Sequence, residues 1–202
     1  MDRDMSQLRT LDKAGADEVF FGCREEDFRV LPKPKRVSKY ISNEQRNLCY
    51  GDPVSISHRE LLGDLDGSDI LTNAWIVGVP GEFQLNSGAT GVESIQSFFG
   101  DEEYVQTYKT AARSTKYEKC ALVDTRWAVD TPDGYGLLCF SPTVVDTESE
   151  IDVVTRLYEP NTSQRWLRVP ITSQDSTYVR YGDPLACVVP LELDALSRQA
   201  IV

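Results

Sequence analysis

The pattern of apolar and polar positions is clearest in the stretch Cys120–Asp146. Two apolar runs, Ala121–Val129 and Tyr135–Phe140, are separated by the pentad D-T-P-D-G at Asp130–Gly134. Proline presets φ for the first corner of a turn and glycine accepts positive φ, so this pentad predicts a tight turn. The stretch therefore predicts two strands joined as a β-hairpin, which presents the large ring of Trp127 to a core.

Short segments of the same kind recur every eight to twelve residues, with Gly, Pro and Asp turns between them. Some alternate polar with apolar residues, and Leu185–Pro190 is apolar throughout, which predicts a strand buried on both faces. Val92, Ile95 and Phe98 recur at helical or loop spacing, and the tail Leu191–Val202 has a helical composition. The pattern predicts a mainly β fold, a barrel or sandwich of short strands with few short helices. The further predicted strands are Ile70–Val79, Glu82–Asn86, Ile151–Arg156, Trp166–Ile171 and Tyr178–Arg180.

The first forty residues differ from the rest, so we assign residues 1–40 to an extended N-terminal arm or linker and 41–202 to a single β domain. Two prolines in Leu31–Lys39 disfavour helix, and this segment is the strongly basic one in the chain. The arm could dock on an acidic neighbouring subunit or on packaged nucleic acid, and the alternative is a solvated linker. The candidate partner-binding residues are Lys33, Lys35, Arg36 and Lys39.

The net charge of −11 changes the choice of partners. Lysine is scarce, with seven against fourteen arginines, and eighteen aspartates and fourteen glutamates complete the charged residues. This balance fits a protein of a high-salt cytosol, where screening reduces self-repulsion, or a merely acidic protein. Free nucleic acid is a poor candidate partner because phosphate binding needs a basic face. The sequence lacks a long apolar span and a signal pattern, so we expect a soluble protein with no membrane partner.

Few residue types suited to catalysis or metal binding are present. The five cysteines form no C-x-x-C pair and His58 is the single histidine, which argues against a zinc site and a histidine-based triad. Cysteines beside apolar runs indicate buried, reduced thiols. Asp64, Asp66 and Asp69 surround a glycine and are the candidate ligands for calcium or sodium, although a solvated turn is the preferred interpretation. We expect no cofactor. Trp75, Trp127 and Trp166 are interpreted as core or interface anchors.

Three segments resemble an uncharacterised family found in tailed bacteriophages and bacterial genomes. The family carries W-x-I-x-T-P-P-G-Y-S-x-L-F, then V-D-T-D, then G-T-P-I-A-Q. Here Trp127–Leu138 reads W-A-V-D-T-P-D-G-Y-G-L-L, Val144–Glu148 reads V-V-D-T-E and Gly182–Cys187 reads G-D-P-L-A-C. The resemblance is strongest over residues 127–190 and implies a phage-like context. The departures are Asp133 for a proline, Gly136 for a serine and Cys187 for a glutamine.

More distantly, the order of these segments resembles the β-clip fold of the dUTPases and dCTP deaminases. That resemblance implies a homotrimer, and it implies that Asp146 could activate a water molecule as a general base. The arginine-serine-glycine phosphate loop of those enzymes is missing, because Phe140-Ser141-Pro142 runs almost straight into Val144. Without phosphate donors, nothing at that position stabilises the charge that develops during phosphoryl chemistry.

From these patterns we predict a non-catalytic structural protein of a tailed virus, in which a haloarchaeal host is one option. It would be a head, neck, tail or decoration component that contacts copies of itself and other virion proteins. It would be located in the virion and assembled in the host cytoplasm, at high salt if the host is halophilic. The alternatives are a dUTPase- or dCTP deaminase-like enzyme that handles nucleotides through Asp146, and a β module that binds a sugar or another small molecule.

Overall fold

The computed structural model describes residues 8–10, 19–37, 73–87, 92–96, 104–109, 119–142, 150–158 and 166–193. These residues are mainly strand, with one short 3-10 helix, η2 (Asp27–Arg29). They confirm the predicted mainly β class. No helix in the described part of the chain is long and apolar enough to cross a membrane. The strands are β1 (Leu8–Thr10), β2 (Phe20–Arg24), β3 (Lys35–Arg36), β4 (Trp75–Gly78), β5 (Glu82–Leu85), β6 (Val92–Gln96), β7 (Val105–Lys109), β8 (Lys119–Asp130), β9 (Tyr135–Phe140), β10 (Asp152–Val153), β11 (Arg156–Tyr158), β12 (Trp166–Thr172), β13 (Thr177–Val179) and β14 (Pro184–Glu192).

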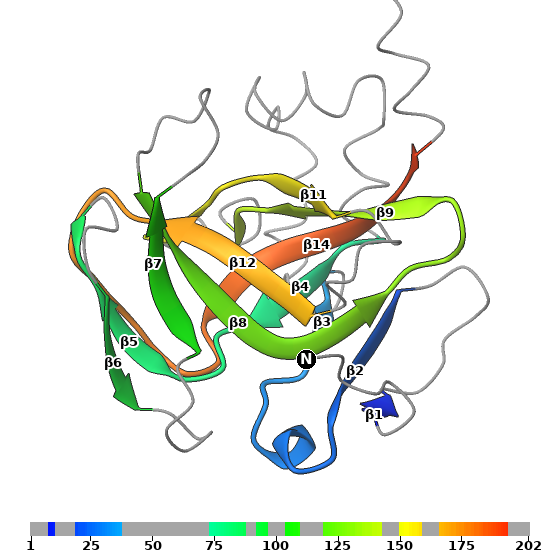
Figure 1. Ribbon diagram of the computed structural model, residues 1–202, viewed down its shortest axis with the longest axis horizontal. Helices are drawn as coiled ribbons and strands as arrows, with labels where there is room; N and C mark the ends of the chain where they lie inside the picture. The colour runs from blue at the N-terminus through cyan, green and yellow to red at the C-terminus, as the bar shows by residue number, and fades with distance from the viewer. Residues whose placement is uncertain are drawn as a thin grey trace, which may run out of the picture.

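The strands form three sheets (Figure 1). The β8 sheet has the order β1-β2-β8-β12-β10, and β7 also pairs with β8. The β14 sheet has the order β11-β9-β14-β4-β3, and the small β5 sheet has the order β13-β5-β6. Every strand pairing among the described residues is antiparallel, as expected for short strands joined by turns. The described sheets are open, so the arrangement is closer to a sandwich than to a closed barrel.

The main core lies between the β8 and β14 sheets, whose strands cross in Figure 1. Trp127 of β8 is fully buried there, and its indole nitrogen donates a hydrogen bond to Pro32 O at 3.2 Å. Phe21 packs against Trp127 at 6.3 Å and against Trp75 at 5.3 Å between ring centroids. Edge-on ring contacts of this kind add to the stabilisation from buried apolar area. Trp127 is therefore the core anchor that its apolar run predicts.

The predicted hairpin between Ala121 and Phe140 is wrong in its pairing. The tight turn is present, with Tyr135 N donating to Pro132 O at 3.1 Å and Gly134 at φ +84°. However, β8 pairs with β2, β7 and β12, whereas β9 pairs with β11 and β14. Leu137 to Phe140 are buried at every position, so β9 needs apolar layers on both faces and lies inside a sheet. The turn consequently passes the chain from one sheet to the other.

The N-terminal segment is also different from the prediction of an arm. Residues 19–37 belong to the sheets, because β2 pairs with β8 and β3 pairs with β4. Leu31 is 4% exposed and Val37 is fully buried, so the apolar residues of this stretch anchor it. The proline-rich sequence is extended as predicted, but burial fixes it to the domain. The expectation of helix or loop around Val92 is likewise corrected, since Val92–Gln96 is a strand.

Candidate anion-binding site

A β-bulge interrupts the pairing of β8 with β12 beside the ion pair of Asp124 and Arg168. The register shifts between Trp166 and Arg168, and on β8 the bulge contains Arg126 with φ +61°. A left-handed conformation costs an L-residue about 1–2 kcal/mol, so the surrounding structure has to hold it. Thr125 helps from the inside, because its hydroxyl donates to Leu167 O at 2.8 Å and accepts from Trp127 N at 3.3 Å.

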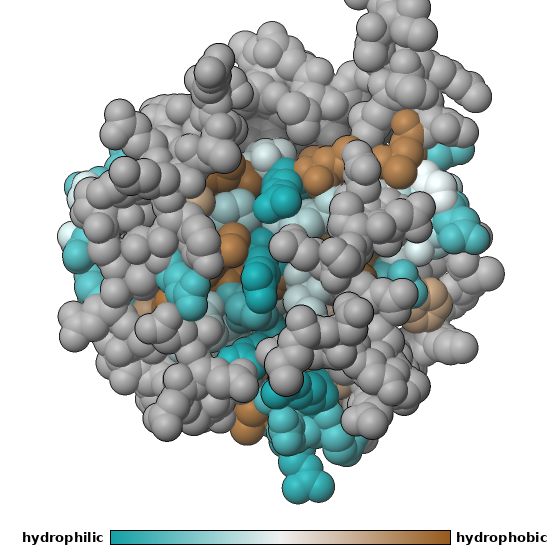
Figure 2. Space-filling view, viewed as in Figure 1, coloured by the Kyte–Doolittle hydropathy of each residue, from teal (hydrophilic) through white to brown (hydrophobic). Residues whose placement is uncertain are grey.

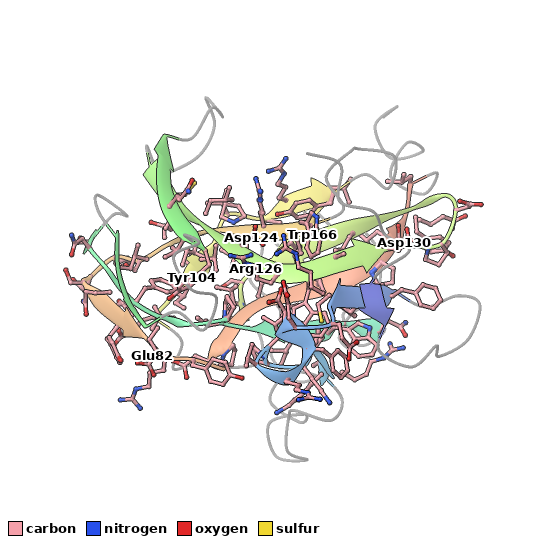
Figure 3. All side chains as sticks on the ribbon, turned by 60° about the horizontal axis from the view of Figure 1, so that its bottom comes forward. Glu82, Tyr104, Asp124, Arg126, Asp130 and Trp166 are labelled. Atoms are coloured by element: carbon pink, nitrogen blue, oxygen red, sulfur yellow. The ribbon has the colours of Figure 1, made fainter. Side chains whose placement is uncertain are left out.

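Asp124 connects the two sides of the bulge. Its Oδ1 accepts a hydrogen bond from Arg126 N at 3.0 Å, and its Oδ2 lies 3.5 Å from Arg168 Nε. Arg168 is directly opposite Asp124 in the register, with side chains 45% and 19% exposed respectively. The Asp124 backbone N also donates to Tyr104 O at 2.7 Å. Figure 3 labels Asp124, Arg126 and Trp166 along the centre of β8 and β12.

The edge strand β11 completes the site from the β14 sheet. The Tyr158 hydroxyl donates to Arg168 O, which joins β11 to β12. The guanidinium of Arg156 stacks over the Tyr158 ring, 4.9 Å from its centroid. Burial raises the pKa of Tyr158, the nearby Cys139 raises it further, and Arg156 acts in the opposite direction. Tyr158 is therefore a neutral hydroxyl donor at physiological pH.

We call Arg126, Arg156 and Arg168, with Asp124 and Tyr158, the arginine cluster. It combines the ion pair of Arg168 with Asp124, the backbone contact of Arg126 with the same carboxylate and the Arg156–Tyr158 pair, in a chain whose net charge is −11. Figure 2 shows the molecule in the view of Figure 1, with a hydrophilic strip over the centre of the face that is visible there. Guanidinium groups present planar pairs of N–H donors that match the oxygens of phosphate and carboxylate groups. The exposed guanidinium groups of Arg156 and Arg168 are thus suited to binding an anion, and phosphate in particular.

The predicted partner-binding residues lie elsewhere. Lys33 is exposed over the ring of Phe28 at 4.9 Å, and Lys35 is exposed on β3. Arg36 stacks on Trp75 at 4.4 Å and donates to Asn73 O at 3.4 Å. Since β3 and β11 are opposite edges of the β14 sheet, this basic segment is separated from the arginine cluster by three strands.

The remaining predicted site residues lie outside the described residues. These are Lys39, the candidate metal ligands Asp64, Asp66 and Asp69, and the candidate base Asp146. Among the residues that the structure describes, no group of three or more His, Cys, Asp or Glu side chains is placed to hold a metal ion.

Sequence reasoning missed the arginine cluster. Its signal is faint: Asp124 and Arg126 interrupt the apolar run Ala121–Val129, and Arg168 interrupts Trp166–Ile171. Both arginines read as the ordinary polar face of a half-buried strand. The register that places Arg168 opposite Asp124, and the bulge beside it, depend on pairing between segments about forty residues apart.

Comparisons with known proteins give the following. No protein-family model matches the chain, and a comparison with curated proteins also found no match. Solved structures of phage dUTPases are similar at low identity. A point mutant of the dUTPase from phage phi11 of S. aureus is 12% identical, over 59% of this chain and 76% of that chain, with a TM-score of 0.38. A mutant of the phage 80alpha dUTPase is 12% identical, over 79% and 88%, with a TM-score of 0.39. The 80alpha enzyme with dUPNHPP is 13% identical, over 59% and 70%, with a TM-score of 0.38.

The functional prediction is corrected on this comparison. The similar solved structures are phage dUTPases, and this contradicts the prediction of a non-catalytic structural protein of a tailed virus. Its dUTPase-like alternative is the better supported of the two interpretations. At these TM-scores the similarity concerns the general β architecture, and any statement about binding has to come from the side chains of this chain.

Proposed function

We propose that this chain is a nucleotide-handling protein of the dUTPase type, and that it binds the phosphate groups of a nucleotide at the arginine cluster. The observation that carries the proposal is the link between two exposed arginines, because Arg156 stacks on Tyr158 and the Tyr158 hydroxyl binds the backbone of Arg168 beside the bulge. The order of the segments that resemble dUTPase motifs, Pro132–Tyr135 before Gly182–Cys187, is consistent with it.

The charges of the cluster suit a polyphosphate. The Asp124 carboxylate lies beside Arg168 Nε, and the terminal nitrogens of Arg168 and the exposed guanidinium of Arg156 are the positive groups for a ligand. The guanidinium carbon of Arg156 lies 4.9 Å from the centroid of the Tyr158 ring, and this cation–π contact does not use the N–H groups as hydrogen-bond donors. Charge-assisted hydrogen bonds to phosphate are roughly twice as strong as neutral ones. In an acidic protein this local excess of positive charge also directs an anion to this face.

Hydrolysis of the bound nucleotide is the enzymatic part of the proposal. Binding phosphate supplies stabilisation of developing charge, and a general base has to activate water. Asp146 is the base implied by the resemblance, and its role is tested by turnover. The first assay measures pyrophosphate release from dUTP, dCTP and the other deoxynucleoside triphosphates, each with and without Mg²⁺.

Charge-neutralising variants make this assay specific. Arg156→Gln and Arg168→Gln remove guanidinium groups of the cluster, and we expect each to reduce turnover by at least tenfold. Arg180→Gln is the matched control, because Arg180 is an exposed arginine after β13, in a different sheet from β8 and β12. Turnover that is equally low in all three variants would contradict a role of the cluster, and so would unchanged turnover in the two cluster variants.

We further propose that the chain self-associates, with a homotrimer as the state to test. Lys33 and Lys35 are exposed beside the edge strand β3, and an otherwise acidic copy is a complementary partner for them. Light scattering after gel filtration gives the mass at low and at molar salt. We expect Lys33→Gln/Lys35→Gln to reduce the mass toward that of a monomer while the melting temperature is unchanged. A monomer in the wild type at both salt concentrations contradicts self-association.

A further inference from the structure

Asp124 makes a set of contacts that an ordinary surface carboxylate does not make. One oxygen caps the backbone of the bulge at Arg126 N, 3.0 Å away, and the other lies 3.5 Å from Arg168 Nε. Its own backbone N is bound by Tyr104 O at 2.7 Å, which fixes the residue to the start of β7. The carboxylate is therefore held at one place and contacts two of the three arginines of the cluster through different atoms.

The contact with Arg126 concerns the backbone. Arg126 has φ +61° and is 3% exposed, an arrangement that glycine or asparagine tolerates far better than arginine. A side-chain oxygen that accepts from the N–H two residues later is the contact of an Asx turn, and it stabilises this local geometry. Asp124 therefore holds the bulge that sets where the Arg126 side chain starts.

The contact with Arg168 concerns the guanidinium group. Asp124 engages Nε, so the two terminal nitrogens of Arg168 are not needed for this pair. On the other side, the Tyr158 hydroxyl binds Arg168 O, and Arg156 stacks on that same tyrosine. The position of Arg168 is consequently fixed at its backbone and at Nε, and its terminal N–H groups can serve a ligand without a large loss of side-chain entropy.

We propose that Asp124 is the positioning residue of the arginine cluster: its carboxylate fixes the bulge at Arg126 and the guanidinium of Arg168, so that phosphate binding depends on a negative charge at this position. The inference rests on the proposed function, because it concerns the same site. It makes an unusual prediction for an anion site. Removing a carboxylate beside the Arg168 guanidinium should tighten anion binding by simple electrostatics, whereas loss of positioning should weaken it.

The test is isothermal titration of the full chain with inorganic pyrophosphate and with a non-hydrolysable imido analogue of dUTP. Asp124→Asn keeps an oxygen that can accept from Arg126 N but loses the charge that holds Arg168. Arg168→Lys keeps the positive charge but lacks the Nε–H that Asp124 engages. Asp133→Asn is the control, because Asp133 is exposed in the turn between β8 and β9 and the change in net charge is the same. Near-ultraviolet circular dichroism of the buried Trp127 verifies that each variant is folded.

The outcomes separate this inference from the proposed function. We expect Asp124→Asn and Arg168→Lys each to bind both probes about tenfold more weakly than the wild type, with Asp133→Asn unchanged. If the wild type binds and Asp124→Asn binds equally well or more tightly, the positioning role is overturned while the anion site stands. If the folded wild type binds neither probe, the proposed function fails and the positioning role fails with it.

Discussion

Gly136 of β9 lies where the structure leaves almost no room for a side chain. A Cβ at this position would lie 2.8 Å from Leu193 Cδ2, 3.0 Å from Leu157 Cδ1 and 3.2 Å from Tyr158 O. Two of these neighbours are side-chain ends that can shift, but Tyr158 O is backbone of β11, the strand that carries Arg156. Overpacking of a core destabilises a protein by about 1–3 kcal/mol, and replacing a glycine inside a strand by alanine stabilises it by roughly 0.5–1 kcal/mol. We therefore expect Gly136→Ala to lower the free energy of unfolding by about 1–2 kcal/mol.

A thermal melt followed by circular dichroism measures the effect. For a chain of this length a loss of 1 kcal/mol corresponds to about 2–4 °C, so the expected decrease in melting temperature is roughly 2–8 °C. The control is Gly134→Asn in the preceding turn, where φ is +84° and a Cβ would meet nothing within 4 Å. Asparagine tolerates the left-handed region, so this variant should lose about 1 kcal/mol or less. A melting temperature of Gly136→Ala at or above that of the wild type would refute the close packing of β9 against β11.

Three further perturbations test other parts of the structure. Tyr158→Phe removes the hydroxyl that donates to Arg168 O, so it should lower the free energy of unfolding by about 1 kcal/mol and weaken binding of the dUTP analogue about fivefold. An unchanged affinity in calorimetry would argue against the link from β11 to β12. Arg36→Ala removes the stacking on Trp75 and should lower the free energy of unfolding by about 0.5–1 kcal/mol without changing the affinity for the dUTP analogue. Loss of binding in this variant would indicate that the nucleotide binds at β3. Burial raises the pKa of Cys139 from 9.0 to about 12, so its contribution to stability is complete below pH 9 and is lost as the pH rises toward 12. Urea unfolding should accordingly show a steeper alkaline loss in the wild type than in Cys139→Ala, by up to about 1.4 kcal/mol per pH unit, and parallel profiles would contradict the buried thiol.

Local sequence determines several elements of this fold. The turn at Pro132 and Gly134 follows from the preferred φ of these two residues, and it is found where they stand. The apolar run Leu185–Val189 is buried at every position in the middle of the β14 sheet, as a run without polar alternation predicts. In both cases the physical cause lies within a few consecutive residues, so the element can be predicted from the sequence alone.

Pairing partners and the site depend on segments that are distant in sequence. The runs on both sides of the turn look like the two strands of a hairpin, yet they belong to different sheets because each needs neighbours on both edges. Val92 and Ile95 have a spacing that suits a helix or a loop, and pairing with β5 makes this segment a strand. The arginine cluster combines β8, β11 and β12, and a bulge places Arg126 in a conformation that its residue type disfavours. Such a position cannot be recognised from residue type or periodicity.

Binding of the dUTP analogue to the wild type and to Arg156→Gln/Arg168→Gln, measured by isothermal titration at two salt concentrations, is the most direct test of the anion site. We predict saturable binding by the wild type that weakens as salt rises, and at least a hundredfold loss of affinity in the double variant if the two contacts contribute independently. Binding of equal strength in the folded double variant, or no binding by the folded wild type, would contradict the assignment of nucleotide phosphates to the arginine cluster.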